Sequence, residues 1–318
     1  MSLSLMQPSR KIRVLRWLGS LVALALLIIL FVQQGWEEIF SAVEKITVLD
    51  LIISLCLVFL SRFAVAGRWF VLLRATDVEI SLRQVLRLTF AGLFGSNFLP
   101  TTIGGDLIRL AGAIQLKIDG GISAASLVVD RLVGMLGMAI VLPLGIGSLV
   151  SWVSTNPVSA PQKYIESLLF TSQVGRIWKK GVHIFERVVR SLAIWRKKPK
   201  ALVLGLVFTS LHMLFLFCAI YVLLHGMHNS LPLWKIAGLW SFVYFVTLIP
   251  ISINGLGLQE ISISFVFSNV GGISIESGLV VAVLIRTLVM VASLPGALFV
   301  PAIMAASDAN KEKSISNG

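Results

Sequence analysis

Apolar segments long enough to cross a lipid bilayer recur along almost the whole of this chain. They cover residues 14–32, 49–73, 122–143, 202–224 and 278–304, and a membrane-spanning helix needs about 20 mainly apolar residues. Charged residues make up only 13% of the sequence, whereas a soluble domain has about 25%. The sequence therefore predicts an all-α polytopic membrane protein, with about six to eight transmembrane helices once interrupted segments are included.

Two of the interrupted segments share one pattern. Residues 99–105 read LPTTIGG and residues 249–255 read IPISING, so a proline, a hydroxyl residue and a glycine occupy matching offsets. Proline and glycine end a helix and allow the next one to start at a new angle. In a membrane, such broken backbone is tolerated only where protein or a water-filled cavity surrounds it. We expect residues 82–116 and 234–270 to form two broken helical hairpins; two kinked helices without a ligand are the alternative.

Basic residues predict how these segments cross the membrane, because cytoplasmic loops carry most of the Lys and Arg. Both ends of the first hairpin are basic, so we expect it to enter from the cytoplasm and the second to enter from outside. Residues 49–143 and 202–304 then form an inverted-topology repeat, within a single membrane domain over residues 1–306. The basic segment 176–200 joins the two halves at the cytoplasmic face, and the pattern does not locate the return crossing within residues 144–174.

The same charge bias predicts a multi-pass protein of the cell membrane with both termini in the cytoplasm. The polar tail, residues 307–318, is expected to be disordered. Arg68 and Arg74 are expected together at the cytoplasmic end of the second apolar run. His212, in the middle of a later run, is expected to make a hydrogen bond between helices.

Ionisable side chains inside the predicted membrane depth are the candidates for a binding site. Each costs roughly 2.5–3.5 kcal/mol at a helix centre, so such groups point to function. Four arginines face three acids in these segments, and guanidinium groups bind phosphate through paired hydrogen bonds. Together with residues at the two breaks, the predicted substrate-binding set is Arg62, Asn97, Pro100, Gly104, Gly105, Asp106, Arg109, Asp130, Arg131, Pro250, Ser252, Gly255, Gly257, Glu260 and Arg286.

A structural role is the alternative for several of these residues. Asp106 and Glu260 would each open a helix after a break, where an acid stabilises the helix dipole. Arg109 would then pair only with Asp106, and Arg286 only with Glu260. The two cysteines lie within apolar runs, so we expect neither a disulfide framework nor a metal site, and no cofactor is indicated.

Three phrases give the chain a resemblance to a known family. They are residues 97–109 with NFLP, GGD and Arg109, residues 130–134 (DRLVG), and residues 250–260 with PIS, GLG and Glu260. They are similar to the transmembrane region of lysylphosphatidylglycerol synthases, whose stand-alone members are called flippase-like integral membrane proteins. The chain has Gln259 where that family usually has arginine. The soluble aminoacyl-transferase domain of the synthases is not expected here, so the resemblance implies the translocation half of the activity.

We therefore predict a lipid flippase, not an enzyme, that moves an anionic or modified lipid between leaflets: a phospholipid, a glycolipid or a polyprenoid-linked intermediate. Membrane lipids are the expected partners, with anionic headgroups at the cytoplasmic face, and nucleic acid is not. A transferase acting on a lipid headgroup is an open alternative, with Asp106 and Glu260 as its candidate acid–base pair. A non-catalytic subunit of an envelope lipid pathway is another, and a homo-oligomer or an envelope-biosynthesis partner stays open.

Overall fold

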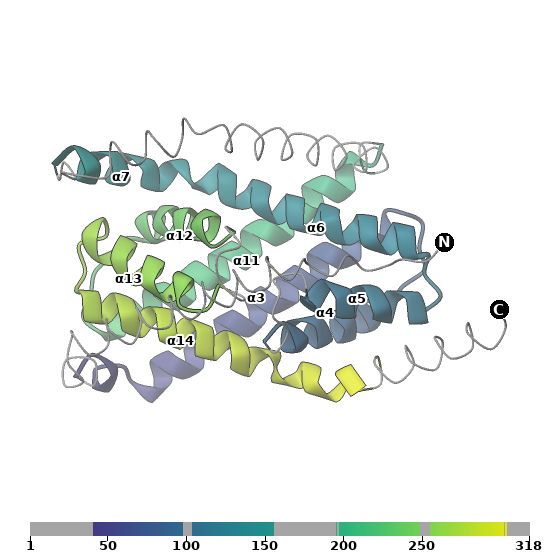
Figure 1. The fold of residues 1–318 in the computed structure, drawn as a ribbon, viewed down its shortest axis with the longest axis horizontal. Coiled ribbons are helices and arrows are strands. Elements are labelled where there is room, and N and C mark those ends of the chain that lie inside the picture. The colour runs from purple at the N-terminus through teal and green to yellow at the C-terminus, as the bar shows by residue number, and fades with distance from the viewer. Residues whose placement is uncertain are drawn as a thin grey trace, which may run out of the picture.

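The computed structural model describes residues 41–97, 104–155, 195, 197–248, 255–301 and 303, and in these ranges the chain forms helices and no strand. The helices, shown in Figure 1, are α3 (Val48–Arg74), α4 (Leu82–Ser96), α5 (Gly104–Gln115), α6 (Gly120–Val141), α7 (Pro143–Thr155), α11 (Pro199–Gly226), α12 (Leu233–Thr247), α13 (Leu258–Asn269), α14 (Ile275–Ser293) and the 3₁₀-helix η2 (Leu294–Leu298). The predicted all-α fold is confirmed for this part of the chain.

Four of these helical segments are long and apolar enough to cross a membrane: α3, α6, α11, and α14 continued by η2. They coincide with the predicted apolar runs at 49–73, 122–143, 202–224 and 278–304, which confirms a polytopic helical membrane protein. In Figure 1 these helices run roughly along the long axis of the molecule. The predicted run at 14–32, the tail at 307–318 and most of the basic segment lie outside the described residues.

Each predicted hairpin is found as a pair of helices. α4 and α5 flank the first break, α12 and α13 flank the second, and the two pairs lie at opposite ends of the molecule (Figure 1). α4 and α5 approach closely at two glycines, because a Cβ on Gly105 would lie 2.5 Å from the carbonyl oxygen of Gly92. The break residues, including Pro100, Pro250 and Ser252, lie outside the described residues. The inverted relation between the two halves stays a prediction.

Polar caps set where the long helices begin. At α3 the Thr47 hydroxyl accepts a hydrogen bond from the Asp50 amide (3.2 Å), and the Asp50 carboxylate accepts one from the Thr47 amide (3.0 Å). Ser81 and Gln84 form the same reciprocal box at α4. Such boxes satisfy N–H groups that a helix leaves without partners in its first turn. Both helices therefore start at fixed positions, which sets the depth of the residues that follow.

The last predicted run is not one continuous α-helix. α14 ends at Ser293, and the chain continues as η2 with Pro295 near its start. Proline has no N–H to donate to the preceding turn. Gly296 also brings η2 against α4, since a Cβ there would lie 2.0 Å from the carbonyl oxygen of Phe90. The end of the last span therefore packs against the first hairpin.

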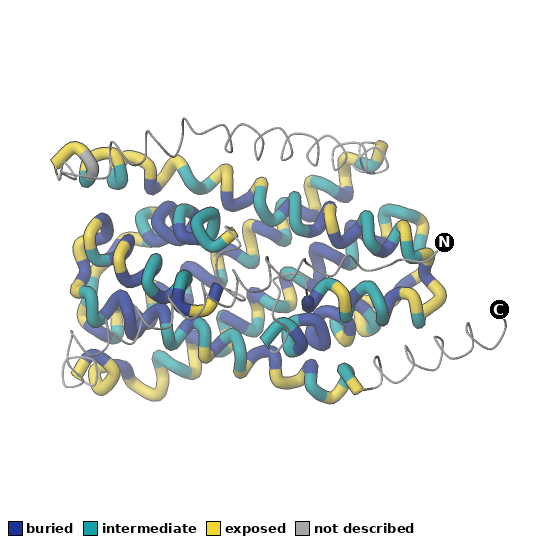
Figure 2. Tube along the Cα trace, viewed as in Figure 1, coloured by how far each residue is buried: buried dark blue, intermediate teal, exposed yellow. Residues whose placement is uncertain are grey.

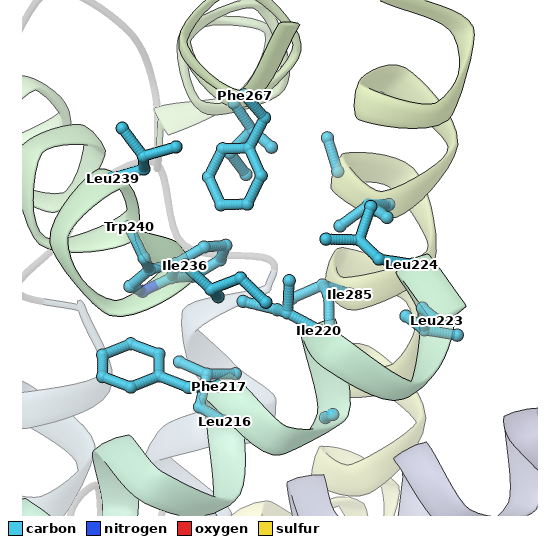
Figure 3. Close-up of a cluster of buried hydrophobic side chains, with 14 of the residues drawn as sticks. Leu216, Phe217, Ile220, Leu223, Leu224, Ile236, Leu239, Trp240, Phe267 and Ile285 are labelled. Atoms are coloured by element: carbon cyan, nitrogen blue, oxygen red, sulfur yellow. The ribbon is translucent and has the colours of Figure 1, made fainter. Parts of the chain in front are cut away.

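The main apolar core lies between α11, α12, α13 and α14 (Figure 3). Its fully or almost fully buried side chains include Phe217, Ile220, Leu223, Leu224, Ile236, Leu239, Trp240, Phe267 and Ile285. In Figure 2, buried residues lie mainly on the sides of the helices that face the interior, and exposed residues lie mainly on their outer sides and at the ends of the molecule. Large apolar side chains such as Leu60, Phe63 and Val203 are exposed on those outer faces, as a lipid-facing surface requires.

α3 and α11 pack against each other through small and polar residues. A Cβ on Gly67 would lie 2.5 Å from the ring of Phe208, so a larger residue there would displace this ring. Near the middle of both helices, Ser61 Oγ and His212 Nδ1 are 2.6 Å apart and share a hydrogen bond. The predicted interhelical hydrogen bond of His212 is therefore confirmed.

Candidate functional site

A buried carboxylate on α6 is the centre of the first ion-pair group. Asp130 is 2% exposed and accepts a hydrogen bond from Arg68 Nε of α3 at 2.7 Å. It also accepts from both terminal nitrogens of Arg109 of α5, at 3.3 Å each. Arg68 makes a further bond of 3.2 Å to Thr209 Oγ1 of α11. Asp130 therefore ties three helices together, because two arginines from different elements converge on one carboxylate.

Arg109 is held from several sides. Its guanidinium lies 4.1 Å from the centre of the Trp69 ring, a distance at which the cation is attracted to the aromatic face. The Trp69 indole N–H donates to Ser126 Oγ at 3.1 Å, which fixes the ring. Arg109 also pairs with Asp106 at 3.2 Å. The alternative in which Arg109 pairs only with Asp106 is wrong, because Arg109 also binds Asp130.

Arg131, the neighbour of Asp130 in the chain, completes this group. Its Nε donates to Asp106 Oδ2, and its side chain is 37% exposed, far more than those of Arg68 and Arg109 at 9%. Three arginines thus face two aspartates, and the group carries one excess positive charge. Arg131 is the most exposed of the three cations, and it shares the Asp106 carboxylate with Arg109.

Glycines lie against these arginines at positions where a side chain would collide with them. A Cβ on Gly134 would lie 2.9 Å from the terminal nitrogen of Arg68, and a Cβ on Gly92 would lie 2.8 Å from Cγ of Arg109. Gly104 and Gly105 are buried at the start of α5. A larger residue at any of these close contacts would push against an arginine or the facing helix.

The second ion-pair group belongs to the second hairpin. Arg286 of α14 donates to Glu260 and also, at 3.2 Å, to the carbonyl oxygen of Gly255 and to Gln259 Oε1. Glu260 is 3% exposed and accepts the amide of Gly257 at 2.8 Å. Gly255 and Gly257 have φ angles of 70° and 76°, a left-handed conformation that favours glycine. The alternative in which Arg286 pairs only with Glu260 is wrong, because Arg286 also donates to Gly255 and Gln259.

The two acids at the hairpins have the surroundings that the structural alternative describes, and a ligand role for them stays a prediction. Asp106 lies in the first turn of α5 and Glu260 in the first turn of α13, where a negative charge stabilises the helix dipole. Each is also the partner of at least one arginine. The dipole alternative is therefore compatible with the site, and does not replace it.

The expected position of Arg68 at the cytoplasmic end of the second apolar run is wrong. Arg68 was expected with Arg74 at the end of the run, but it is 7% exposed and bound to Asp130. A basic residue close to the end of an apolar run resembles a membrane-flanking charge, so sequence position alone misplaces it. Among the described residues, four arginines pair with the three acids, as the sequence predicted in number, but Arg68 takes the place expected for Arg62.

Two further residues were not predicted. Gln259 stands where the resembled family usually has arginine, and it accepts a hydrogen bond from Arg286. Trp69 makes a cation–π contact with the Arg109 guanidinium. No local sequence signal marks either contact, because each joins elements far apart in the chain. Asn97, which was predicted, donates to Ser293 Oγ at 2.8 Å and so links α4 to the end of α14.

Two cavities open beside these groups. One of about 160 Å³ lies between α3, α4, α5 and α6, with Val65, Ser96, Asp106, Arg109 and Arg131 among its walls. The other, of about 270 Å³, lies between α6 and the two helices of the second hairpin, α12 and α13. Its walls include Arg131, Trp240, Tyr244, Gly255 and Gln259.

Arg131 borders both cavities, so the two spaces adjoin at this side chain. The first cavity is lined by Asp106, which lies next to the first break, and the second by Gly255 and Gln259, which lie next to the second. Residues next to the two breaks therefore line adjoining cavities. Within the described ranges, no three His, Cys, Asp or Glu side chains come together in an arrangement that could hold a metal ion.

Arg62 is placed apart from both ion-pair groups. It lies near the middle of the 27-residue α3, its side chain is half-buried, and its Nε is buried without a hydrogen-bond partner. The structure thus leaves Arg62 outside two groups of predicted residues, which are Asp106, Arg109, Asp130 and Arg131 in one and Gly255, Gly257, Glu260 and Arg286 in the other.

Comparison with known proteins agrees with the phrases that the sequence shares with lysylphosphatidylglycerol synthases. A search of curated proteins found no match to the chain. The family model described as "Lysylphosphatidylglycerol synthase TM region" matches residues 16–296, which include both hairpins and both ion-pair groups. The chain therefore belongs to the family of lysylphosphatidylglycerol synthase transmembrane regions.

Proposed function

We propose that this protein moves an anionic lipid between the leaflets of the cell membrane, with the headgroup passing through the two cavities that adjoin at Arg131. One observation carries the proposal: a partly exposed arginine lines both cavities, one beside each hairpin. The family supports action on lipids in a membrane. The predicted inverted repeat adds a reason for two opposed hairpins, since alternating-access transporters are commonly built that way.

The chemistry of Arg131 suits a transient phosphate contact. Its present partner Asp106 also binds Arg109, so Asp106 remains paired when Arg131 turns to a ligand. The Arg131 side chain is 37% exposed, and a guanidinium can bind phosphate through two parallel hydrogen bonds. A lipid phosphate can therefore replace Asp106 as the partner of Arg131 without leaving a carboxylate unpaired.

The size and lining of the cavities favour a headgroup over a whole lipid. Their volumes of about 160 and 270 Å³ lie below the roughly 300–1,000 Å³ typical of sites that enclose a drug-sized molecule. We propose that the acyl chains stay in the bilayer while the polar headgroup alone enters. The substrate class is then an anionic or modified phosphate-bearing lipid, and the two termini are proposed to face the cytoplasm.

We propose translocation and not headgroup chemistry, because of where the two candidate acids lie. A transferase would need Asp106 and Glu260 as a cooperating acid–base pair near one reacting atom. Instead each acid belongs to a different ion-pair group and is engaged by arginine. No contact among the described residues favours the third candidate, a non-catalytic subunit of an envelope lipid pathway.

The test uses the purified full chain in liposomes that contain a panel of headgroup-labelled lipids. We expect at least one phosphate-bearing lipid to change leaflet faster than in protein-free vesicles, and a matched neutral lipid without phosphate not to do so. Arg131→Gln should remove the effect. Arg83→Gln, the same substitution at an exposed position outside both cavities, should preserve it. Equal rates for Arg131→Gln and the native protein would refute the proposed role of this site.

A further inference from the structure

Arg62 differs from the other arginines of the predicted site. Arg68, Arg109, Arg131 and Arg286 each lie within ion-pair distance of at least one carboxylate. Among the residues that the structure describes, Arg62 has no carboxylate within 4.0 Å, and its buried Nε makes no hydrogen bond. A guanidinium in the middle of a membrane-spanning helix is strongly destabilising without a counter-charge. Contacts among the described residues therefore give no reason for the retention of this charge.

The described groups around Arg62 supply no negative charge. Its chain neighbour Ser61 is bound to His212 of α11, and the next charged residue along α3 is Arg68, which is paired with Asp130. Because Arg62 is half-buried and not fully enclosed, part of its guanidinium can still be reached. An accessible cation without a described carboxylate partner is a binding position for an anion.

The position of Arg62 on α3 relates it to the first cavity. Arg62, Val65 and Trp69 follow one another at spacings of three and four residues, so they share one face of the helix. Val65 lines the first cavity, and Trp69 carries Arg109 on its ring. Arg62 thus lies one turn beyond the cavity wall, and the six residues to Arg68 correspond to about 9 Å along the helix.

We propose that Arg62 is a transit site for the phosphate of the translocated lipid, which supplies the counter-charge that no described residue provides. The phosphate reaches Arg62 from the first cavity, whose wall residue Val65 lies one turn away on α3, before it moves on through the cavities that adjoin at Arg131. This inference rests on the proposed translocation function and adds an intermediate position to it. A carboxylate beside Arg62 would compete with the phosphate, and a neutral residue would leave the phosphate without a partner there.

Thermal unfolding of the purified full chain, in neutral detergent without phospholipid, tests the first part of this inference. If Arg62 has no internal partner, Arg62→Gln should leave the Tm unchanged or raise it, because an uncompensated charge is removed. Arg68→Gln is the matched comparison and should lower the Tm by several degrees, since it leaves Asp130 with one partner fewer. A fall in Tm for Arg62→Gln equal to that for Arg68→Gln would overturn the inference, because it would reveal a structural partner.

Ligand-dependent unfolding tests the second part. Short-chain phosphatidylglycerol should raise the Tm of the native protein with increasing concentration, and the rise should be smaller for Arg62→Gln and intermediate for Arg62→Lys. Inorganic phosphate at the same concentration should produce little of this shift. An equal shift from inorganic phosphate would identify a free-anion site and overturn the transit role, as would an undiminished lipid shift in Arg62→Gln.

The liposome assay separates this inference from the function on which it rests. Arg62→Gln should slow transbilayer movement at least tenfold, while Arg83→Gln should match the native rate. If the native protein moves no lipid, the proposed function fails, and the transit role fails with it even where the lipid-dependent Tm shift identifies Arg62 as an anion site. If the native protein moves lipid and Arg62→Gln moves it equally fast, the transit role alone is refuted.

Discussion

Replacing Asp130 with asparagine perturbs the first ion-pair group at its centre with almost no change in volume. The carboxylate is 2% exposed and is shared by Arg68 and Arg109. The substitution Asp130→Asn would leave Arg68 without an acidic partner among the residues that the structure describes, whereas Arg109 would keep Asp106. Breaking a buried pair by removing one partner costs about 3–5 kcal/mol, which corresponds to a fall in Tm of roughly 4–8 °C for a chain of this size.

The assay is thermal unfolding of the purified full chain in neutral detergent. Asp77→Asn provides the matched control, because Asp77 is 86% exposed and pairs with Lys198 at a half-exposed position. Such a pair contributes about 0–1 kcal/mol, so the control should change the Tm little. A double variant with Asp130→Asn and Arg68→Gln should be less destabilised than the sum of the two single variants, since it removes both partners. An Asp130→Asn protein as stable as the Asp77→Asn protein would refute the assignment of Asp130 as a structural centre.

The remaining predictions concern packing, the second ion-pair group and topology. Gly105→Ala should lower the Tm, because its Cβ would lie 2.5 Å from a backbone oxygen, whereas Gly147→Ala, with nothing within 4 Å, should not; equal Tm values would contradict the close approach. Arg286→Lys should stay folded and lose translocation, since lysine keeps the charge but not the planar fork that contacts three acceptors; normal translocation would argue against a ligand role. A cysteine at position 117 should react with a membrane-impermeant reagent from the cytoplasmic side and one at position 235 from outside, and the reverse would contradict the predicted topology.

The helices of this fold were largely predictable because their signals are local. Apolar runs such as 49–73 and 202–224 need only be long enough to span a bilayer. The helices found there begin and end within a few residues of the predicted bounds. The pairing of α4 with α5 and of α12 with α13 followed from proline and glycine at matching offsets. The change to η2 after Ser293 was not predicted, since it depends on contact between Gly296 and α4 as well as on Pro295.

The candidate site was predictable as a set of residues and not as a set of pairs. Asp130 and Arg109 were chosen because charge is costly at membrane depth, and both are buried as that reasoning requires. Arg68 was misplaced because a basic residue near the end of an apolar run also fits a flanking position. Which arginine meets which acid depends on how α3, α5 and α6 pack, and single-sequence patterns carry no information on that packing.

Movement of anionic lipids across the bilayer is the activity that we propose for this protein, and it can be measured as the transbilayer rate of one labelled anionic phospholipid. Vesicles would contain increasing numbers of protein copies, and a membrane-impermeant quencher would report the fraction of label in the outer leaflet. We expect the accessible fraction to change at a rate that rises with protein copies and that falls to the protein-free rate for Arg131→Gln. A rate equal to that of protein-free vesicles at every protein density, for every anionic lipid tried, would show that the protein does not translocate such lipids.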